Sequence, residues 1–245
     1  MIDNNSFDIP KKEVEDAPIY DPVADMYEAT FEDFTVRARE WEWITNKIKA
    51  TSGAKSLLEI GCGNGAMMYR LAPYTAYAVG IDVSSRLLSY ARKRNSNYLH
   101  VNFIETTSSH IPIQDHSFDL IVSVLSWRYL NWQETAKEIK RLLKPGGKFL
   151  LVDMCRQSQK SFKFMRFAKE KTQFLLGVLR YPRHHKNLRS MVRSLEWKQL
   201  IQKNPPKTKD EYEQFFKTNF VDINMEILSY GWNHEIVAIT ADHRS

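Results

Sequence analysis

The pattern of apolar and polar positions divides the middle of the chain into short apolar runs separated by stretches of helical character. The apolar runs predict buried strands at residues 56–60, 76–82, 100–104, 117–123 and 148–153. Helices are predicted after the first run, after the second run with Ser84 as its cap, and over residues 133–143. Strands that alternate with helices in this way predict right-handed crossovers and a parallel sheet covered on both faces.

The two ends of the chain have a different pattern. Residues 1–18 are polar and contain prolines, which predicts a mobile arm, and residues 31–50 carry apolar side chains at helical spacing, which predicts an amphipathic helix. After residue 153 the chain is expected to be helical at first and to close with a strand hairpin. The expected elements are helices up to Arg180, over 188–202 and over 210–217, and strands over 220–230 and 235–240 joined by a turn at 231–233.

Composition narrows the class of protein. The apolar content of 43% and the charged content of 26% are ordinary for a globular chain. No run approaches the roughly 18 apolar residues that a membrane span needs, and the first residues lack the layout of a signal peptide. Cys62 and Cys155 fit neither a disulfide framework nor a zinc pattern. We therefore expect a cytoplasmic enzyme without a bound metal.

The net charge of +6 is unevenly distributed. Residues 156–209 contain fifteen Lys and Arg and two acids, so this segment carries +13 and the rest of the chain −7. One interpretation is an amphipathic lid with solvated charges. Others are steering of an acidic small molecule, binding of nucleic acid, and binding to an anionic membrane.

A glycine-rich turn at residues 61–65 carries the first chemical signal. It follows the strand at 56–60 and precedes a helix, so peptide N–H groups and the positive end of the helix dipole point into the turn. The turn satisfies G-x-G-x-x-A, which is compatible with a nicotinamide or flavin dinucleotide. Asp82, about 20 residues downstream at the end of a strand, suits the ribose hydroxyls of any adenosine-bearing cofactor. Its alternative role is to cap the following helix.

Four motifs in register extend this pattern. They are LEIGCGNG at 58–65, GID at 80–82, Ile111-Pro112 ahead of SFDLIVS at 117–123, and LLKPGG at 142–147. Together they resemble the class I S-adenosylmethionine-dependent methyltransferases, closest to the branch with small-molecule and quinone-pathway enzymes. The resemblance covers about residues 20–153. It implies a Rossmann-like, doubly wound α/β fold with a seven-stranded, mostly parallel sheet, an antiparallel last strand and an α-helical lid insertion.

The resemblance also implies a cofactor site for S-adenosylmethionine. Glu59, Gly61, Cys62 and Gly63 would hold its methionine end. The ribose hydroxyls would bond to Asp82, and the adenine would pack on Val83. Ser123 would lie near the sulfonium, and Tyr20 and Tyr27 match an element that covers the cofactor in relatives, although they could also anchor a helix to the core. Relatives often have an acid at the position of Thr107, so the adenine contact is expected from its hydroxyl or from Glu105.

The methyl acceptor is expected at the edge of the sheet beyond residue 123. Trp127, Arg128 and Tyr129 are the predicted substrate residues, because an arginine between aromatic rings suits a flat or anionic molecule. In the alternative interpretation, Trp127 and Trp132 belong to the core and Arg128 caps the strand. The histidines that could serve as a base are His110, His116, His184, His185 and His234, and the tyrosines could also serve; no catalytic residue is assigned.

The predicted function is methylation of a small, aromatic or anionic acceptor at oxygen, nitrogen or carbon, with S-adenosylhomocysteine as product, by a monomer or homodimer. The alternatives are an RNA (tRNA or rRNA) methyltransferase that uses the basic segment, and a non-catalytic S-adenosylmethionine-binding subunit. The predicted domain organisation comprises an N-terminal arm and lid helix (1–50), a cofactor-binding core (51–155), a basic helical substrate lid (156–217) and closing strands of the core (218–245).

Overall fold

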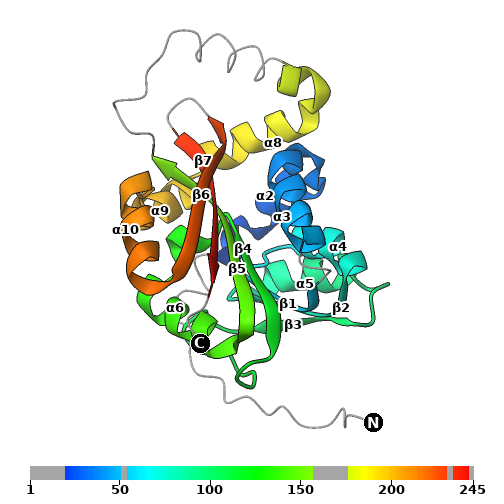
Figure 1. Ribbon diagram of the computed structural model, residues 1–245. Helices are drawn as coiled ribbons and strands as arrows, with labels where there is room; N and C mark the ends of the chain where they lie inside the picture. The colour runs from blue at the N-terminus through cyan, green and yellow to red at the C-terminus, as the bar shows by residue number, and fades with distance from the viewer. Residues whose placement is uncertain (1–19, 51–53, 157–175, 231–233, 243–245) are drawn as a thin grey trace.

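The computed structural model describes residues 20–50, 54–156, 176–230 and 234–242. The predicted arm at 1–18, the first part of the basic segment and the turn at 231–233 lie outside these residues. In the described part, a central sheet separates two layers of helices, and further helices lie across one end of it (Figure 1).

Seven strands form the sheet in the order β3-β2-β1-β4-β5-β7-β6. β1 to β5 pair in parallel, whereas β7 is antiparallel to both β5 and β6. This arrangement confirms the predicted fold class. The strands are β1 (Ala54–Ile60), β2 (Thr75–Asp82), β3 (Val101–Glu105), β4 (Phe118–Val124), β5 (Leu143–Arg156), β6 (Val221–Tyr230) and β7 (His234–Asp242).

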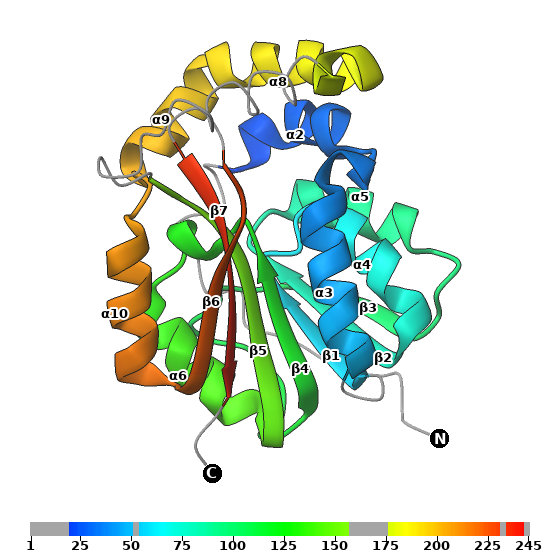
Figure 2. The same cartoon turned by 45° about the horizontal axis from the view of Figure 1, so that its top comes forward.

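The helices cover the two faces of the sheet because each carries an apolar stripe. One core cluster joins the sheet to α6 (Trp132–Leu142) and α10 (Lys209–Asn219) through buried residues such as Ile139 and Phe216. The other joins it to α3 (Ala38–Ala50) and α4 (Ala66–Leu71) through residues such as Ile44 and Met68. α5 (Ser85–Arg94) lies beside α4 (Figure 2). Short 3-10 helices are η1 (Asp21–Val23), η2 (Phe34–Arg37), η3 (Ala72–Tyr74) and η4 (Trp127–Tyr129).

The single helix predicted over residues 31–50 is wrong at its start. The chain forms α2 (Ala24–Phe31), then η2, and only then α3. The side chain of Asp33 accepts a hydrogen bond from the backbone N of Thr35 at 2.9 Å. This bond gives the backbone an alternative to continuous helix, as short acids often do.

The helix predicted over 188–202 is also two helices, α8 (Pro182–Arg193) and α9 (Leu195–Lys203). Ser194 has an extended backbone, and its hydroxyl accepts a bond from the backbone N of Trp197 at 3.1 Å, so it caps α9 and ends α8. The helix expected up to Arg180 ends there, because Tyr181 is not helical and Pro182 starts α8. The fifth strand is longer than predicted, and it begins at Leu143 rather than at Lys148.

α8 and α9 lie across the end of the molecule near the carboxyl ends of the parallel strands, with α8 alongside α2 (Figure 2). His184 Nδ1 is 2.8 Å from the carbonyl oxygen of Thr30, and Asn187 donates to that of Ala29 at 2.6 Å. Among the described residues, no helix has the length and apolar character needed to cross a membrane. The division of the chain into four parts stays a prediction.

Candidate functional site

A glycine turn at residues 61–65 joins β1 to α4. Gly61, Gly63 and Gly65 have φ values of +72°, +52° and +68°, a left-handed backbone that strains other residues. A Cβ at Gly65 would lie 2.8 Å from the Cβ of Ala91 in α5, so close packing also requires glycine there. The backbone N atoms of Gly61 and Cys62 donate to the carbonyl of Ile81 at 2.9 and 3.0 Å, which ties the turn to β2.

Asp82 lies at the carboxyl end of β2, directly beside this turn. Its Oδ2 accepts a hydrogen bond from the backbone N of Gly63 at 2.8 Å, and its Oδ1 accepts one from the backbone N of Ser84 at 3.0 Å. Burial raises the pKa of the carboxyl, and the bonds from these amides oppose that rise. Each oxygen retains a second lone pair and part of the residue is exposed, so the carboxylate can accept bonds from a ligand.

Glu59 is buried beneath the turn, with 2% of its surface exposed. Burial raises the pKa of its carboxyl well above the ordinary value, the nearby charge of Asp82 adds to this rise, and a backbone bond from Met68 opposes it. Its Oε2 is buried and has no hydrogen-bond partner among the described residues. A buried acceptor without a partner costs free energy, which a donor from a ligand would recover.

Cys62 points away from the open side of the turn, toward the neighbouring strand. Its thiol lies against Gly80, where an added Cβ would come within 2.9 Å of Sγ. Burial raises the pKa of this thiol well above its ordinary value, so the side chain stays neutral. The backbone of Cys62, which bonds to β2, is therefore its contribution to the turn.

The loop after β3 lies beside the carboxyl end of β2, close to the glycine turn. The backbone N of Thr106 donates to the carbonyl of Asp82 at 3.0 Å, which brings the loop to the end of β2. Thr107 and Val83 are both partly exposed there, and Thr107 Oγ1 is 3.1 Å from Ser109 Oγ. Glu105, the alternative to Thr107, pairs with Asp82 in the sheet and is exposed.

Ser123 is fully buried near the end of β4, and its hydroxyl is 2.7 Å from the hydroxyl of Ser126. Ser126 donates to the carbonyl of Ile60 at 2.9 Å and would clash with a Cβ at Gly61, at 2.5 Å. The sequence analysis missed Ser126. It also missed Leu125, whose φ of +55° is uncommon for a non-glycine residue and marks a sharp turn at the end of β4.

The N-terminal helices cover this edge of the sheet. The ring of Tyr27 packs over the glycine turn, 3.6 Å from where a Cβ of Gly63 would lie. The ring of Tyr20 meets the ring of Tyr129 edge to face, with centroids 5.8 Å apart. The two tyrosines therefore reach two different parts of the candidate site, one the glycine turn and the other the predicted substrate residues.

A partly buried ion pair holds α2 on the turn. The Glu28 carboxylate accepts a bond from Asn64 Nδ2 at 2.6 Å and one from Arg94 Nη2 at 2.7 Å. Arg94 also donates to the backbone carbonyl of Asn64. The sequence analysis did not identify this cluster, since its members come from α2, the turn and α5, and no local pattern relates them.

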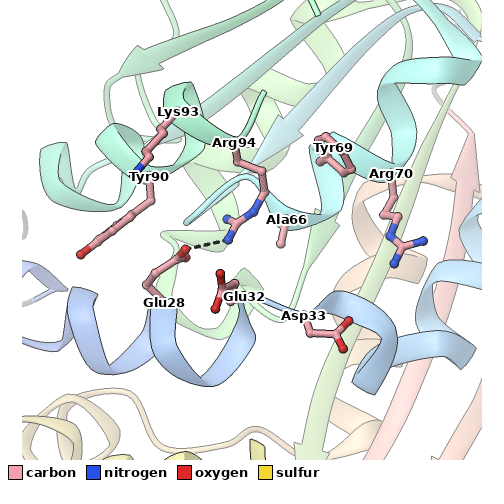
Figure 3. A pocket seen from close by; sticks show the side chains of 9 residues that line it. All are labelled: Glu28, Glu32, Asp33, Ala66, Tyr69, Arg70, Tyr90, Lys93 and Arg94. Carbon is pink, nitrogen blue, oxygen red and sulfur yellow. Dashed lines mark hydrogen bonds and ion pairs between the residues drawn. The ribbon is translucent and has the colours of Figure 1, made fainter. Parts of the chain in front are cut away.

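A cavity of about 660 Å³ lies around this ion pair, between α2, α4 and α5 (Figure 3). None of the predicted site residues lines it. Both acidic and basic side chains line the cavity, and the Glu28–Arg94 ion pair spans it. The lining residues are Glu28, Glu32, Asp33, Ala66, Tyr69, Arg70, Tyr90, Lys93 and Arg94.

Trp127 lies in the core rather than in an open pocket. Its side chain is 0% exposed, and its ring packs against the rings of Trp132, Phe149, Phe215 and Phe216. This corrects its assignment as a substrate residue and corresponds to the alternative interpretation from the sequence. The apolar ring is removed from water by strands and helices that follow it in the chain.

Arg128 and Tyr129 form a pair at the end of β4. The Arg128 guanidinium carbon lies 4.5 Å from the centre of the Tyr129 ring, and its Nη2 donates to the Tyr129 hydroxyl. The backbone N of Arg128 donates to Asp153 Oδ2 at 3.1 Å. Burial is the main cause that raises the pKa of Tyr129, although Arg128 lowers it.

Asp153, in β5, connects the Arg128–Tyr129 pair to α10, the helix that follows the basic segment. Its carboxylate is fully buried and accepts a bond from the hydroxyl of Tyr212, in α10, at 2.8 Å. Burial raises the pKa of Asp153, while the bonds from Tyr212 and from the backbone N of Met154 lower it. The sequence analysis missed both Asp153 and Tyr212 as parts of this edge.

The histidines named as bases differ in position. Burial, and then the charge of Arg128, lower the pKa of His234, so that His234 is neutral near this pair. His184 is bonded to α2, and His185 is beside it with a pKa lowered by burial. His116 Nδ1 is 2.8 Å from the carbonyl oxygen of Leu143, at the start of β5. His110 is exposed in the loop after β3. In the described part of the chain, no group of three or more metal-ligating side chains comes together.

Comparison with known proteins finds a family match in the central part of the chain. A family profile described as "Methyltransferase domain" matches residues 58–151. Demethylmenaquinone methyltransferase from Tropheryma whipplei is 31% identical over 114 residues, which are 46% of this chain and 47% of that protein. The chain thus spans about half the length of the curated relatives it matches.

Solved structures match over a longer part of the chain. The N-methyltransferase NodS from Bradyrhizobium japonicum, at 15% identity, has a TM-score of 0.59 over 87% of this chain and 99% of that one. Phosphoethanolamine N-methyltransferase 2 from Haemonchus contortus, at 16% identity, has a TM-score of 0.64 over 94% of this chain and 59% of that one. At these identities the likeness shows the fold, which is the one that the sequence predicted.

Proposed function

We propose that this chain, whose residues 58–151 match a methyltransferase family profile, is a class I S-adenosylmethionine-dependent methyltransferase of a small aromatic or anionic molecule. The observation that supports the donor most strongly is the pair of acids around the glycine turn. Asp82 is held by amides of the turn and retains acceptor capacity, and Glu59 has a buried oxygen without a partner among the described residues.

The residues fit S-adenosylmethionine at each end. Asp82 would accept hydrogen bonds from the ribose hydroxyls, because each of its oxygens has one bond to a backbone amide and a lone pair to spare. Glu59 Oε2 would accept a bond from the ammonium group. Val83 and Thr107 would flank the adenine, and the backbone at Ser123 would lie near the sulfonium.

S-adenosylmethionine supplies a methyl group that its sulfonium already activates for attack by an oxygen, nitrogen or carbon nucleophile. The chain's contribution is then mainly alignment of the acceptor and exclusion of water. Tyr27 over the glycine turn and Tyr20 against Tyr129 support this role for α2 and η1 as a cover.

The proposed chemical class of the methyl acceptor is inferred from Arg128 and Tyr129. A guanidinium beside an aromatic ring offers donors to a carboxylate or phosphate and a flat surface to a ring. Among the named histidines, His234 is the one we propose as proton acceptor, because burial and then the charge of Arg128 lower its pKa. Demethylmenaquinone and phosphoethanolamine, the acceptors named for two similar proteins, represent the aromatic and the anionic kind.

The test is release of S-adenosylhomocysteine, detected by mass spectrometry, with a panel of naphthoquinols, phenols, carboxylates, phosphorylated amines and bulk tRNA. We expect turnover with one of the small acceptors. Arg128→Ala is expected to lower kcat/KM about tenfold or more while the Kd for S-adenosylmethionine changes less than about twofold. Arg39→Ala, at an exposed position of α3, is the matched control.

Two results would contradict the proposal. Turnover with tRNA alone would indicate the RNA methyltransferase. Tight binding of S-adenosylmethionine without S-adenosylhomocysteine from any acceptor would indicate a non-catalytic binding subunit.

A further inference from the structure

α8 has an inner face that bonds to α2 and an outer face whose cations form no ion pair with any residue that the structure describes. On the inner face, Met191 is fully buried, and His184 and Asn187 bond to carbonyl oxygens of α2. On the outer face, Lys186, Arg189 and Arg193 follow one another at helical spacing and are exposed. We call these three residues the basic face. Within the described part of the chain, no acidic side chain forms an ion pair with them.

Large apolar side chains are exposed at both ends of the basic face. Leu176 and Leu179 precede α8 and are 59% and 79% exposed, Val192 lies within α8 at 42%, and Leu195 starts α9 at 66%. Isolated exposed leucines are ordinary, but these four are half of the exposed large apolar residues of the described chain and fall within 20 consecutive positions. Apolar and cationic side chains are therefore both exposed within this stretch of 20 residues.

The distribution of charge along the chain also favours this side of the molecule as the one that meets an anionic partner. Residues 156–209 carry +13 while the rest of the chain carries −7. Residues 176–209, the described part of this segment, contain nine Lys and Arg and one acid and so carry +8. This charge orients the protein in the field of an anionic surface with α8 and α9 facing that surface. Figure 2 shows α8 and α9 at one end of the molecule, where they can meet a flat surface without obstruction by the sheet.

We infer that the outer side of α8, with its basic face and the flanking leucines, binds the surface of an anionic lipid bilayer. Lipid headgroups pair with Lys186, Arg189 and Arg193, while Leu179 and Leu195 enter the boundary between headgroups and acyl chains. Nucleic acid would pair with the cations equally well, but its phosphates offer nothing to exposed leucines. The joint display of both kinds of side chain is what favours a membrane.

The test measures sedimentation of the whole protein with vesicles of phosphatidylcholine, with and without about 30% phosphatidylglycerol, at about 0.1 M salt. We expect binding to the anionic vesicles and weaker binding as salt rises. Arg189→Gln combined with Arg193→Gln is expected to reduce partitioning about 25-fold, since each basic residue near such a surface contributes about fivefold. Leu179→Ser combined with Leu195→Ser is expected to reduce it about tenfold.

The matched control combines Leu99→Ser with Arg39→Gln, which changes an exposed leucine and an exposed arginine outside the basic segment. It should bind vesicles like the unchanged protein. Circular dichroism verifies that each variant is folded. Absence of binding to anionic vesicles would overturn the inference. So would binding to tRNA that the arginine pair weakens and the leucine pair leaves unchanged. Neither result bears on methyl transfer, which is assayed separately.

Discussion

The two edges of the candidate site, at β1–β2 and at β4–β5, are built from different kinds of contact. At the first, Asp82 bonds to backbone amides of Gly63 and Ser84. At the second, Asp153 accepts bonds from the backbone N of Arg128 and Met154 and, in addition, one from a side chain 59 positions later, that of Tyr212. Backbone groups are common to every sequence that makes the turn, whereas a side-chain contact depends on where distant elements pack. The edge at β1–β2, proposed to hold the methyl donor and called the donor edge here, can therefore be predicted from local motifs. The edge at β4–β5, proposed for the methyl acceptor and called the acceptor edge, cannot.

The largest expected effect is that of Trp127→Ala, which tests whether Trp127 is a core residue or lines the substrate pocket. Trp127→Ala removes a fully buried ring from the aromatic cluster and is expected to lower the free energy of unfolding by about 3–5 kcal/mol, measured by urea denaturation. Leu99→Ala, at a position that is 95% exposed, should change it by less than about 0.5 kcal/mol. If Trp127→Ala kept full stability and lost only turnover, Trp127 would belong to the substrate pocket after all.

Asp82 tests the donor edge. Asp82→Ala should weaken S-adenosylmethionine binding about 100-fold, because the ribose would lose two bonds to a charged acceptor. Calorimetry measures the Kd, and Asp82→Asn, which preserves shape and one acceptor oxygen, should weaken it less. Asp115→Ala, which removes an exposed carboxylate from the surface pair with Arg141, is the control. An unchanged Kd in Asp82→Ala would contradict the ribose assignment.

Tyr212→Phe tests the acceptor edge through its pH dependence. Burial raises the pKa of Asp153 above the ordinary value of 3.8, and the Tyr212 hydroxyl opposes this rise. An acid whose pKa is raised by folding makes the protein lose stability as pH rises from the unfolded pKa through the folded one. Without the hydroxyl the folded pKa rises further, so the destabilisation should increase with pH, to about 1–3 kcal/mol.

The measurement is the free energy of unfolding at about pH 5 and about pH 8 for the variant and the unchanged protein. Tyr69→Phe, at an exposed tyrosine, should show the same small change at both values. An equal loss of stability at both pH values in Tyr212→Phe would mean that the hydroxyl does not act on the ionisation of Asp153.

The sequence predicted the positions of the core strands along the chain and the glycine turn because apolar runs and glycines act locally. Ser84 illustrates this, since the predicted cap accepts a bond from the backbone N of Leu87 three residues later. Where the prediction failed, a single polar side chain decided the local backbone. Asp33 and Ser194 each bond to a nearby amide and divide a helix that the apolar spacing alone would continue.

The sequence by itself determined the fold class and the position of the glycine turn beside Asp82, since strand periodicity and glycine conformations depend on neighbouring residues. Only the tertiary structure decided that Trp127 is in the core, that Glu28 and Arg94 hold α2 on the turn, and that the basic face of α8 is turned outward. These features depend on which elements pack together, and residues tens of positions apart set that packing.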